Sequence, residues 1–135
     1  MEQSELDKLM KCSAEDAVST AQLELAITLD YSPDSIQYVD KAILGFLDKF
    51  SHVALEDKAV FTLCNIFGAY IGEVFKKLAN GTWIYATDKS DAPSIYMKVD
   101  EHTFAFAGVC FEKLVRNQNV SIESYFANAL GQVKN

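Results

Sequence analysis

The chain has 135 residues, half of them hydrophobic, and carries a net charge of −7. This length is enough for one full hydrophobic core, so we expect a single ordered domain over residues 1–135. The acidic balance argues against nucleic acid as a partner, because a phosphate backbone is bound by basic surfaces.

The cysteines and the N-terminus bear on the cellular compartment. Cys12, Cys64 and Cys110 are widely spaced and odd in number, and two of them have apolar neighbours. We therefore expect reduced thiols and neither a disulfide framework nor a metal site. The first residues, MEQSELDK, are acidic and lack the apolar core of a secretion signal, which favours a cytoplasmic location. No cofactor motif is present, so we expect no cofactor.

Acidic residues are concentrated in the first part of the chain. Up to Asp57 there are twelve acids and four lysines, a balance of −8, whereas the remainder has seven acids and eight bases. This one-sided distribution favours a basic protein partner. The alternative is a solvated acidic face that serves solubility alone.

A first helix is predicted near the N-terminus. Ser4 and Ser13 are each followed three residues later by an acid, which is a capping pattern. It predicts a short first turn or two and then a helix from about Ala14 to Leu29.

The segment Asp30-Tyr31-Ser32-Pro33-Asp34 predicts the start of a second helix. Ser32 can cap this helix, and Pro33 occupies its first turn, where a missing N–H costs nothing. We expect the helix to continue to about Phe50, followed by a connector at residues 51–54.

The stretch from Glu56 to Ile84 is expected to organise the fold. Between Val60 and Leu78 the apolar residues cover well over half of the helical circumference, which is typical of a helix buried on most sides. Polar and charged residues interrupt this run, which argues against a membrane span. Gly81 is expected to take the left-handed position that ends the helix.

Gly68 and Gly72 lie one turn apart in this helix and allow another chain segment to come close. Two interpretations stay open, tight packing of a strand or helix on this side and a ligand groove. For Glu73 we expect an ion pair with Lys76 or Lys77, and the alternative is a buried general base.

A β-hairpin is predicted from Thr82 to Val99, with a turn-rich tip and a third short strand at residues 103–106. A helix should follow from Ala107 to Arg116, and a last one from Ser121. The expected fold class is therefore α+β, a mostly helical single domain around one buried central helix, with a small antiparallel hairpin or sheet.

No catalytic constellation is recognisable. His52 and His102 lie in predicted connectors, and neither has neighbours that form a triad or a metal set. A cysteine with a distant histidine is conceivable, but a buried cysteine is usually inert. We therefore expect no catalytic residues, with a small hydrolytic enzyme kept as an alternative.

Several short motifs resemble a bacterial family of small domains of uncharacterised function. They are Tyr31-Ser32-Pro33-Asp34-Ser35-Ile36, Phe67-Gly68-Ala69-Tyr70-Ile71-Gly72-Glu73, Gly81-Thr82-Trp83, Val109 to Arg116 and Ser121-Ile122-Glu123-Ser124-Tyr125-Phe126, and together they span about three quarters of the sequence. The chain departs from the pattern at residues 104–107, where a proline-containing turn is expected. The family implies no catalytic residues, and small acidic domains of this kind are similar to immunity proteins encoded beside bacterial toxins.

The expected function is binding of a basic protein, most specifically neutralisation of a cognate toxin, by a monomer or weak dimer that binds neither nucleic acid nor membrane. A structural or regulatory module is the alternative. The predicted binding surface, called here the acidic face, consists of Asp30, Asp34, Tyr38 and Asp48. Asp88 and Asp91 at the hairpin tip form the rival surface.

Overall fold

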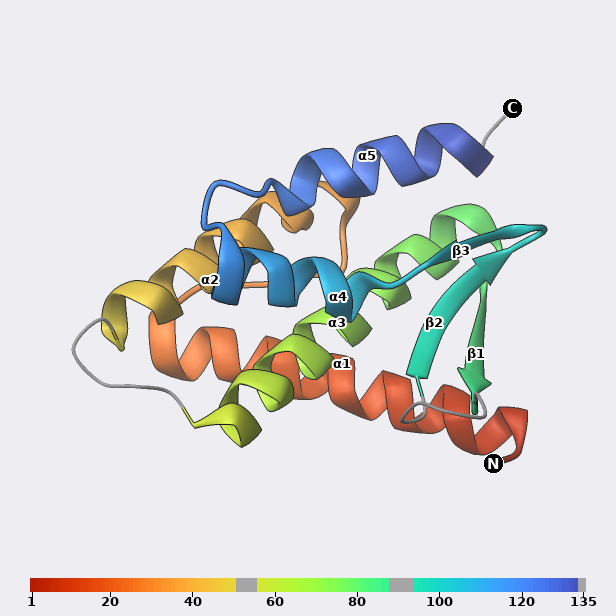
Figure 1. Cartoon of the computed structure of the whole chain (residues 1–135), viewed down its shortest axis with the longest axis horizontal. Helices are drawn as coiled ribbons and strands as arrows, with labels where there is room; N and C mark the ends of the chain where they lie inside the picture. The colour runs from red at the N-terminus through yellow and green to blue at the C-terminus, as the bar shows by residue number, and fades with distance from the viewer. Residues whose placement is uncertain (51–55, 88–93, 134–135) are drawn as a thin grey trace.

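Helix α3 (Asp57–Ala79) lies at the centre of the fold (Figure 1). The computed structural model describes residues 1–50, 56–87 and 94–133 of the chain. Within these ranges the elements are α1 (Gln3–Leu25), a 3-10 turn (Pro33–Ser35), α2 (Ile36–Lys49), α3, β1 (Thr82–Ala86), β2 (Ser94–Val99), β3 (His102–Phe104), α4 (Phe106–Phe111), a π-helical turn (Glu112–Arg116) and α5 (Ile122–Val133). This is the predicted α+β class, mostly helical with a small antiparallel sheet.

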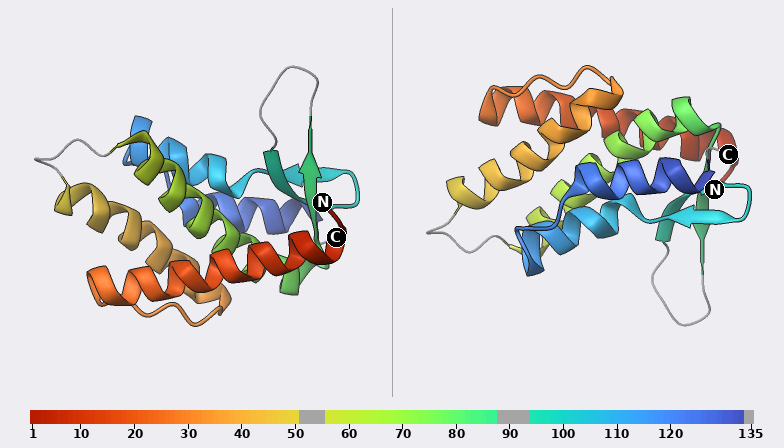
Figure 2. Two further views of the ribbon diagram at one scale, coloured as in Figure 1. Left: turned by 90° about the horizontal axis from the view of Figure 1, so that it is seen from below. Right: turned by 90° about the horizontal axis from the view of Figure 1, so that it is seen from above.

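The helices α1, α4 and α5 pack directly on α3, and α1 and α5 lie on opposite sides of it (Figure 2). By length and composition α3 could cross a membrane, and half of its most apolar stretch is buried within the protein. Its buried side chains include Phe67, Tyr70 and Phe75, each with no exposed surface. The prediction of a central helix buried on most sides is confirmed between Leu63 and Phe75, whereas Phe61 in the preceding turn is 56% exposed.

Helix α1 differs from its prediction. It is one continuous helix from Gln3 to Leu25, so the break before Ala14 is wrong, and it ends four residues before Leu29. The buried residues Leu6, Met10, Ala14, Ala17 and Ala21 continue one apolar stripe through the second capping pattern, and no helix-breaking residue interrupts it. The residue that follows the helix and caps it, Ala26, adopts the left-handed conformation with φ 55°.

The start of the second helix is confirmed in detail. The Ser32 hydroxyl accepts a hydrogen bond from the Ser35 N–H at 3.2 Å, and Pro33 begins a single 3-10 turn before α2. The inward side of α2 carries Ile36, Val39 and Ile43, as predicted.

The end of α3 corrects two predictions. Asn80, and not Gly81, takes the left-handed position with φ 55°, which an asparagine tolerates. Gly81 has a different reason for being glycine, because a Cβ there would lie 2.4 Å from the Met97 sulfur. Lys76 and Lys77 occupy the last turn, as expected.

The three strands form one antiparallel sheet in the order β1-β2-β3, at the end of the molecule where α1 begins and α3 ends (Figures 1 and 2). Trp83, Met97 and Phe104 are cross-strand partners in one row and are all buried against the helices. The third strand was predicted at 103–106 and is found at His102–Phe104. It ends earlier because Phe106 starts α4 and packs on Phe75, with ring centroids 5.2 Å apart.

A buried ion pair between Lys113 and Asp40 holds the C-terminal helix α5 in place against α2. The Lys113 side chain is only 4% exposed and lies 3.4 Å from an Asp40 oxygen. Its ammonium also donates to the carbonyl oxygens of Gln118 and Val120, at 2.8 and 2.6 Å. Asp40 in turn accepts the N–H groups of Ile122 and Glu123, so a residue of α2 caps the start of α5.

The three cysteines are free thiols, as predicted, with Cys12 exposed and the other two buried. Burial raises the pKa of the Cys64 thiol to about 11 and raises that of Cys110 well above its ordinary value. We expect a soluble thiol reagent at about pH 8 to label Cys12 quickly and the buried pair only after unfolding, because the thiolate is the reactive form. Mass spectrometry of the labelled native protein is the measurement. Rapid labelling of two or more thiols would contradict the burial of Cys64 and Cys110.

Candidate functional site

The most unusual backbone position is Tyr31, in the loop between α1 and α2. Its φ is 65°, in the left-handed region that a large side chain rarely adopts, at a cost of about 1–2 kcal/mol. Strain of this kind persists only where the surroundings hold it, and it is concentrated at functional positions in proteins. Tyr31 is therefore the starting point for a candidate site.

Tyr70 holds Tyr31 in this conformation. The Tyr31 N–H donates to the Tyr70 hydroxyl oxygen at 2.8 Å, and the two rings pack with centroids 4.9 Å apart. The same hydroxyl shares a 2.6 Å hydrogen bond with Ser35, whose hydroxyl donates to the Ser32 carbonyl. A buried residue of α3 thus fixes both the strained loop and the start of α2.

Glu73, one turn closer to the end of α3 than Tyr70, is fixed by Trp83 of β1. The indole N–H donates to a Glu73 carboxylate oxygen at 2.8 Å, and the indole ring covers Gly72, where a Cβ would lie 2.0 Å from it. The predicted ion pair of Glu73 with Lys76 or Lys77 is wrong. Lys76 pairs instead with Asp7 of α1 at 3.8 Å, because α1 lies beside that turn of α3.

Gly68 also serves tight packing. A Cβ at this position would lie 2.6 Å from the backbone N and Cα of Ala107, so α4 begins against the surface of α3. Of the two interpretations of the glycine pair, the structure therefore shows close packing at both positions. A hollow of about 530 Å³ adjoins Gly68, lined by residues of α1, α3, the sheet and the start of α4.

A second hollow, of about 380 Å³, lies over Tyr31. It is lined by Lys11 and Glu15 of α1, Tyr31 of the loop, and Glu73 and Lys77 of α3, and is called here the Tyr31 hollow. The Lys77 ammonium lies 5.6 Å from the Tyr31 ring centroid. Burial, and next the charge of Glu15, raise the pKa of the Tyr31 hydroxyl, so it stays neutral at physiological pH.

The first two residues of the predicted acidic face lie beside this loop. Asp30 precedes Tyr31 and is exposed, and hydrogen bonds from Ser32, first from its side chain and then from its backbone N–H, lower the pKa of the Asp30 carboxyl. Asp34 is exposed in the 3-10 turn that follows. The loop and the helix start bring these two acids to one end of α2.

The other two residues of the acidic face lie along α2. Tyr38 is 39% exposed, one turn after Asp34, and the ammonium of Lys41 lies 4.9 Å from its ring centroid. Asp48 is exposed near the far end of α2, about 15 Å from Tyr38 at the helical rise per residue. Lys41 therefore divides the face into a cluster at Asp30, Asp34 and Tyr38 and a separate acid at Asp48.

Asp88, Asp91 and His52 lie outside the residues that the structure describes. His102 is exposed in β3 and stacks on Phe104, with ring centroids 6.3 Å apart. The raised thiol pKa values of Cys64 and Cys110 leave both cysteines protonated near neutral pH, so neither is an activated nucleophile.

The Tyr31 hollow was not predicted from the sequence. Tyr31 was interpreted only as part of a helix start, and neither Lys11 nor Glu15 was predicted as a site residue. A signal was present in the three motif stretches 31–36, 67–73 and 81–83. The first two are joined by hydrogen bonds of Tyr31 and Ser35 to Tyr70, and the last two by the hydrogen bond of Trp83 to Glu73.

Comparison of the chain with protein-family models, with curated proteins and with solved structures gave no match.

Proposed function

We propose that the protein is a non-catalytic binding domain for a basic protein, and most specifically an immunity protein that neutralises a cognate toxin in the bacterial cytoplasm. The observation that carries the proposal is the exposure of the N-terminal acids. All twelve acids up to Asp57 are exposed except Asp7 and Asp40, whose carboxylates contact lysines of other elements. A surface of this kind attracts a basic partner and speeds its association.

The acidic face offers an anchor as well as charge. Tyr38 is exposed between acids, and an exposed tyrosine can bury a large area with little loss of side-chain entropy. The position of the Lys41 ammonium near its ring indicates that the ring can accept a cation. A lysine or arginine of the partner can take the same place.

The direct test is capture of the partner. The tagged protein is incubated with lysate of the source organism at low salt, and bound proteins are eluted with salt and identified by mass spectrometry. The proposal expects a basic protein whose toxicity in a host cell is suppressed by co-expression of this chain. A partner that is acidic, or one whose toxicity is unaffected, would contradict the proposal.

The surface is tested by Asp34→Lys combined with Tyr38→Ala. We expect the double variant to melt like the parent and to associate with the captured partner at least about tenfold more slowly. The loss should shrink between about 0.1 M and about 1 M salt, because the Debye length falls from about 10 Å to about 3 Å. Stopped-flow association kinetics give the measurement.

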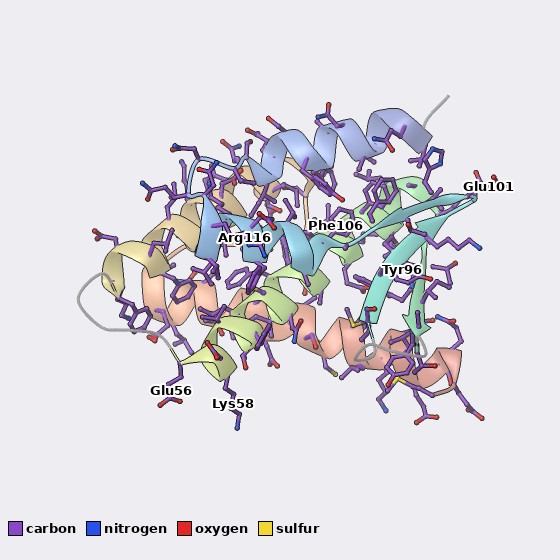
Figure 3. All side chains as sticks on the ribbon, viewed as in Figure 1. Glu56, Lys58, Tyr96, Glu101, Phe106 and Arg116 are labelled. Atoms are coloured by element: carbon purple, nitrogen blue, oxygen red, sulfur yellow. The ribbon has the colours of Figure 1, made fainter. Side chains whose placement is uncertain are left out.

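Glu101→Lys is the matched control for charge, since Glu101 is exposed at the β2–β3 turn, at the opposite end of the molecule from α2 (Figure 3). This variant should associate at nearly the parent rate. If Asp34→Lys with Tyr38→Ala has no effect, while Asp88→Lys with Asp91→Lys slows association, the binding surface is the hairpin tip and the acidic face is excluded.

A further inference from the structure

The Tyr31 hollow gathers charges of both signs that form no ion pair with one another. Lys11, Glu15, Glu73 and Lys77 line it, yet none of the ion pairs among the described residues joins any two of them. One turn away, Lys76 and Asp7 connect the same two helices by an ion pair. The charges around the hollow are therefore available to a ligand.

The two walls of the hollow place these charges in a defined order. Helices α1 and α3 run in opposite directions, with the start of α1 beside the end of α3 (Figure 1). Each wall carries one acid and one lysine four residues apart. On α1 these are Lys11 and Glu15, and on α3 they are Glu73 and Lys77. Residues four apart on a helix have their Cβ atoms about 5–6 Å from each other, so opposite charges are neighbours on each wall. A ligand that uses both signs must carry its own two charges a few ångströms apart.

The Tyr31 ring supplies the apolar surface of the hollow. Its position is fixed by the strained backbone, by the hydrogen bond from its N–H to Tyr70 and by packing of the two rings. Glu73 is fixed in the same way, because the Trp83 indole N–H occupies one of its oxygens. Fixed groups lose little entropy when a ligand binds, which favours affinity.

We propose that the Tyr31 hollow binds a free α-amino acid. Its ammonium would lie at Glu73 and its carboxylate at Lys77, one turn apart on α3, and its side chain against the Tyr31 ring. A simple cation or anion would meet like charges in the same hollow, whereas an α-amino acid carries both charges on neighbouring atoms. A hollow of about 380 Å³ is also within the size range of small-molecule sites.

The first experiment is isothermal titration calorimetry of the whole protein with each common L-amino acid, at up to about 10 mM. At least one should bind with a Kd of about 1 mM or tighter. The N-acetyl derivative and the carboxamide of the best ligand each lack one charge, and each should bind at least about tenfold more weakly. 6-Aminohexanoate, whose charges are far apart, should bind more weakly than the best α-amino acid.

The second experiment uses variants of the lining residues. Glu73→Gln keeps an acceptor for the Trp83 N–H, and Lys77→Met alters an exposed residue, so both should keep the parent melting temperature. Each should weaken binding at least about tenfold. Asp16→Asn, an exposed acid of α1 outside the lining, is the matched control and should bind like the parent.

Three outcomes would overturn the proposal: no binding by any common amino acid, equal binding by the single-charge derivatives, or unchanged binding by the folded Glu73→Gln and Lys77→Met variants. None of these outcomes depends on a protein partner, so the amino-acid site and the proposed function are tested separately.

Discussion

Gly68→Ala is expected to lower the free energy of unfolding by about 2–3 kcal/mol, although alanine is the better helix former by about 1 kcal/mol. The added Cβ would lie 2.6 Å from the backbone N and Cα of Ala107 and 2.9 Å from its Cβ. A backbone cannot move aside as the end of a flexible side chain can, so α4 must separate from α3. Chemical denaturation with urea measures the change.

Gly131→Ala is the matched control for this prediction. Gly131 lies in α5, and a Cβ there would meet nothing within 4 Å, so only the helix propensity changes. We expect this variant to be more stable than the parent by about 0.5–1 kcal/mol. A loss of stability in Gly68→Ala together with a gain in Gly131→Ala would establish the contact of Gly68 with Ala107. If Gly68→Ala is also neutral or stabilising, the close approach of α4 to α3 is wrong.

The sequence predicted the elements whose signals are local. The Ser32 cap with Pro33 located the start of the second helix, and the apolar circumference from Val60 to Leu78 located the central one. The two strands of the hairpin followed from β-branched and aromatic residues separated by turn residues. In each case neighbouring residues carry the information, so tertiary contacts were not needed to identify the element.

Predictions failed where a tertiary contact decides between local alternatives. Ser13 can cap a helix, but the apolar stripe of α1 continues past it along α3. Gly81 can end a helix in the left-handed conformation, but Asn80 takes that position, and Gly81 instead leaves room for the Met97 side chain. Glu73 can pair with a lysine on its own helix, but its carboxylate instead accepts a hydrogen bond from the Trp83 indole N–H.

The candidate sites divide in the same way. The exposure of the residues in the acidic face could be predicted because charge and exposure follow from a helical sequence pattern. The Tyr31 hollow combines residues from positions 11 to 77, and its central residue has a backbone conformation that no local sequence preference indicates. Such a site becomes visible only when α1, α3 and the loop between α1 and α2 are placed together.

The largest expected loss of stability comes from Lys113→Met, about 3–5 kcal/mol. The ammonium is 4% exposed, lies 3.4 Å from Asp40, and donates to the Gln118 and Val120 carbonyls. Its removal leaves a partly buried carboxylate without its cation and two carbonyl oxygens without this donor. Asp40 also caps α5, so we expect α5 to loosen from α2, with faster hydrogen exchange of the Ile122 amide.

Arg116→Met is the matched control, since it removes a cation from the same π-helical turn. The Arg116 side chain is 67% exposed, and its ion pair with Glu112 at 3.2 Å lies on the surface (Figure 3). Exposed pairs of this type contribute little, so the unfolding free energy should change by at most about 0.5 kcal/mol. If the two variants lose equal amounts of unfolding free energy, the burial of Lys113 does not strengthen its ion pair. If Lys113→Met leaves the free energy of unfolding unchanged, Asp40 holds α5 in place without the lysine.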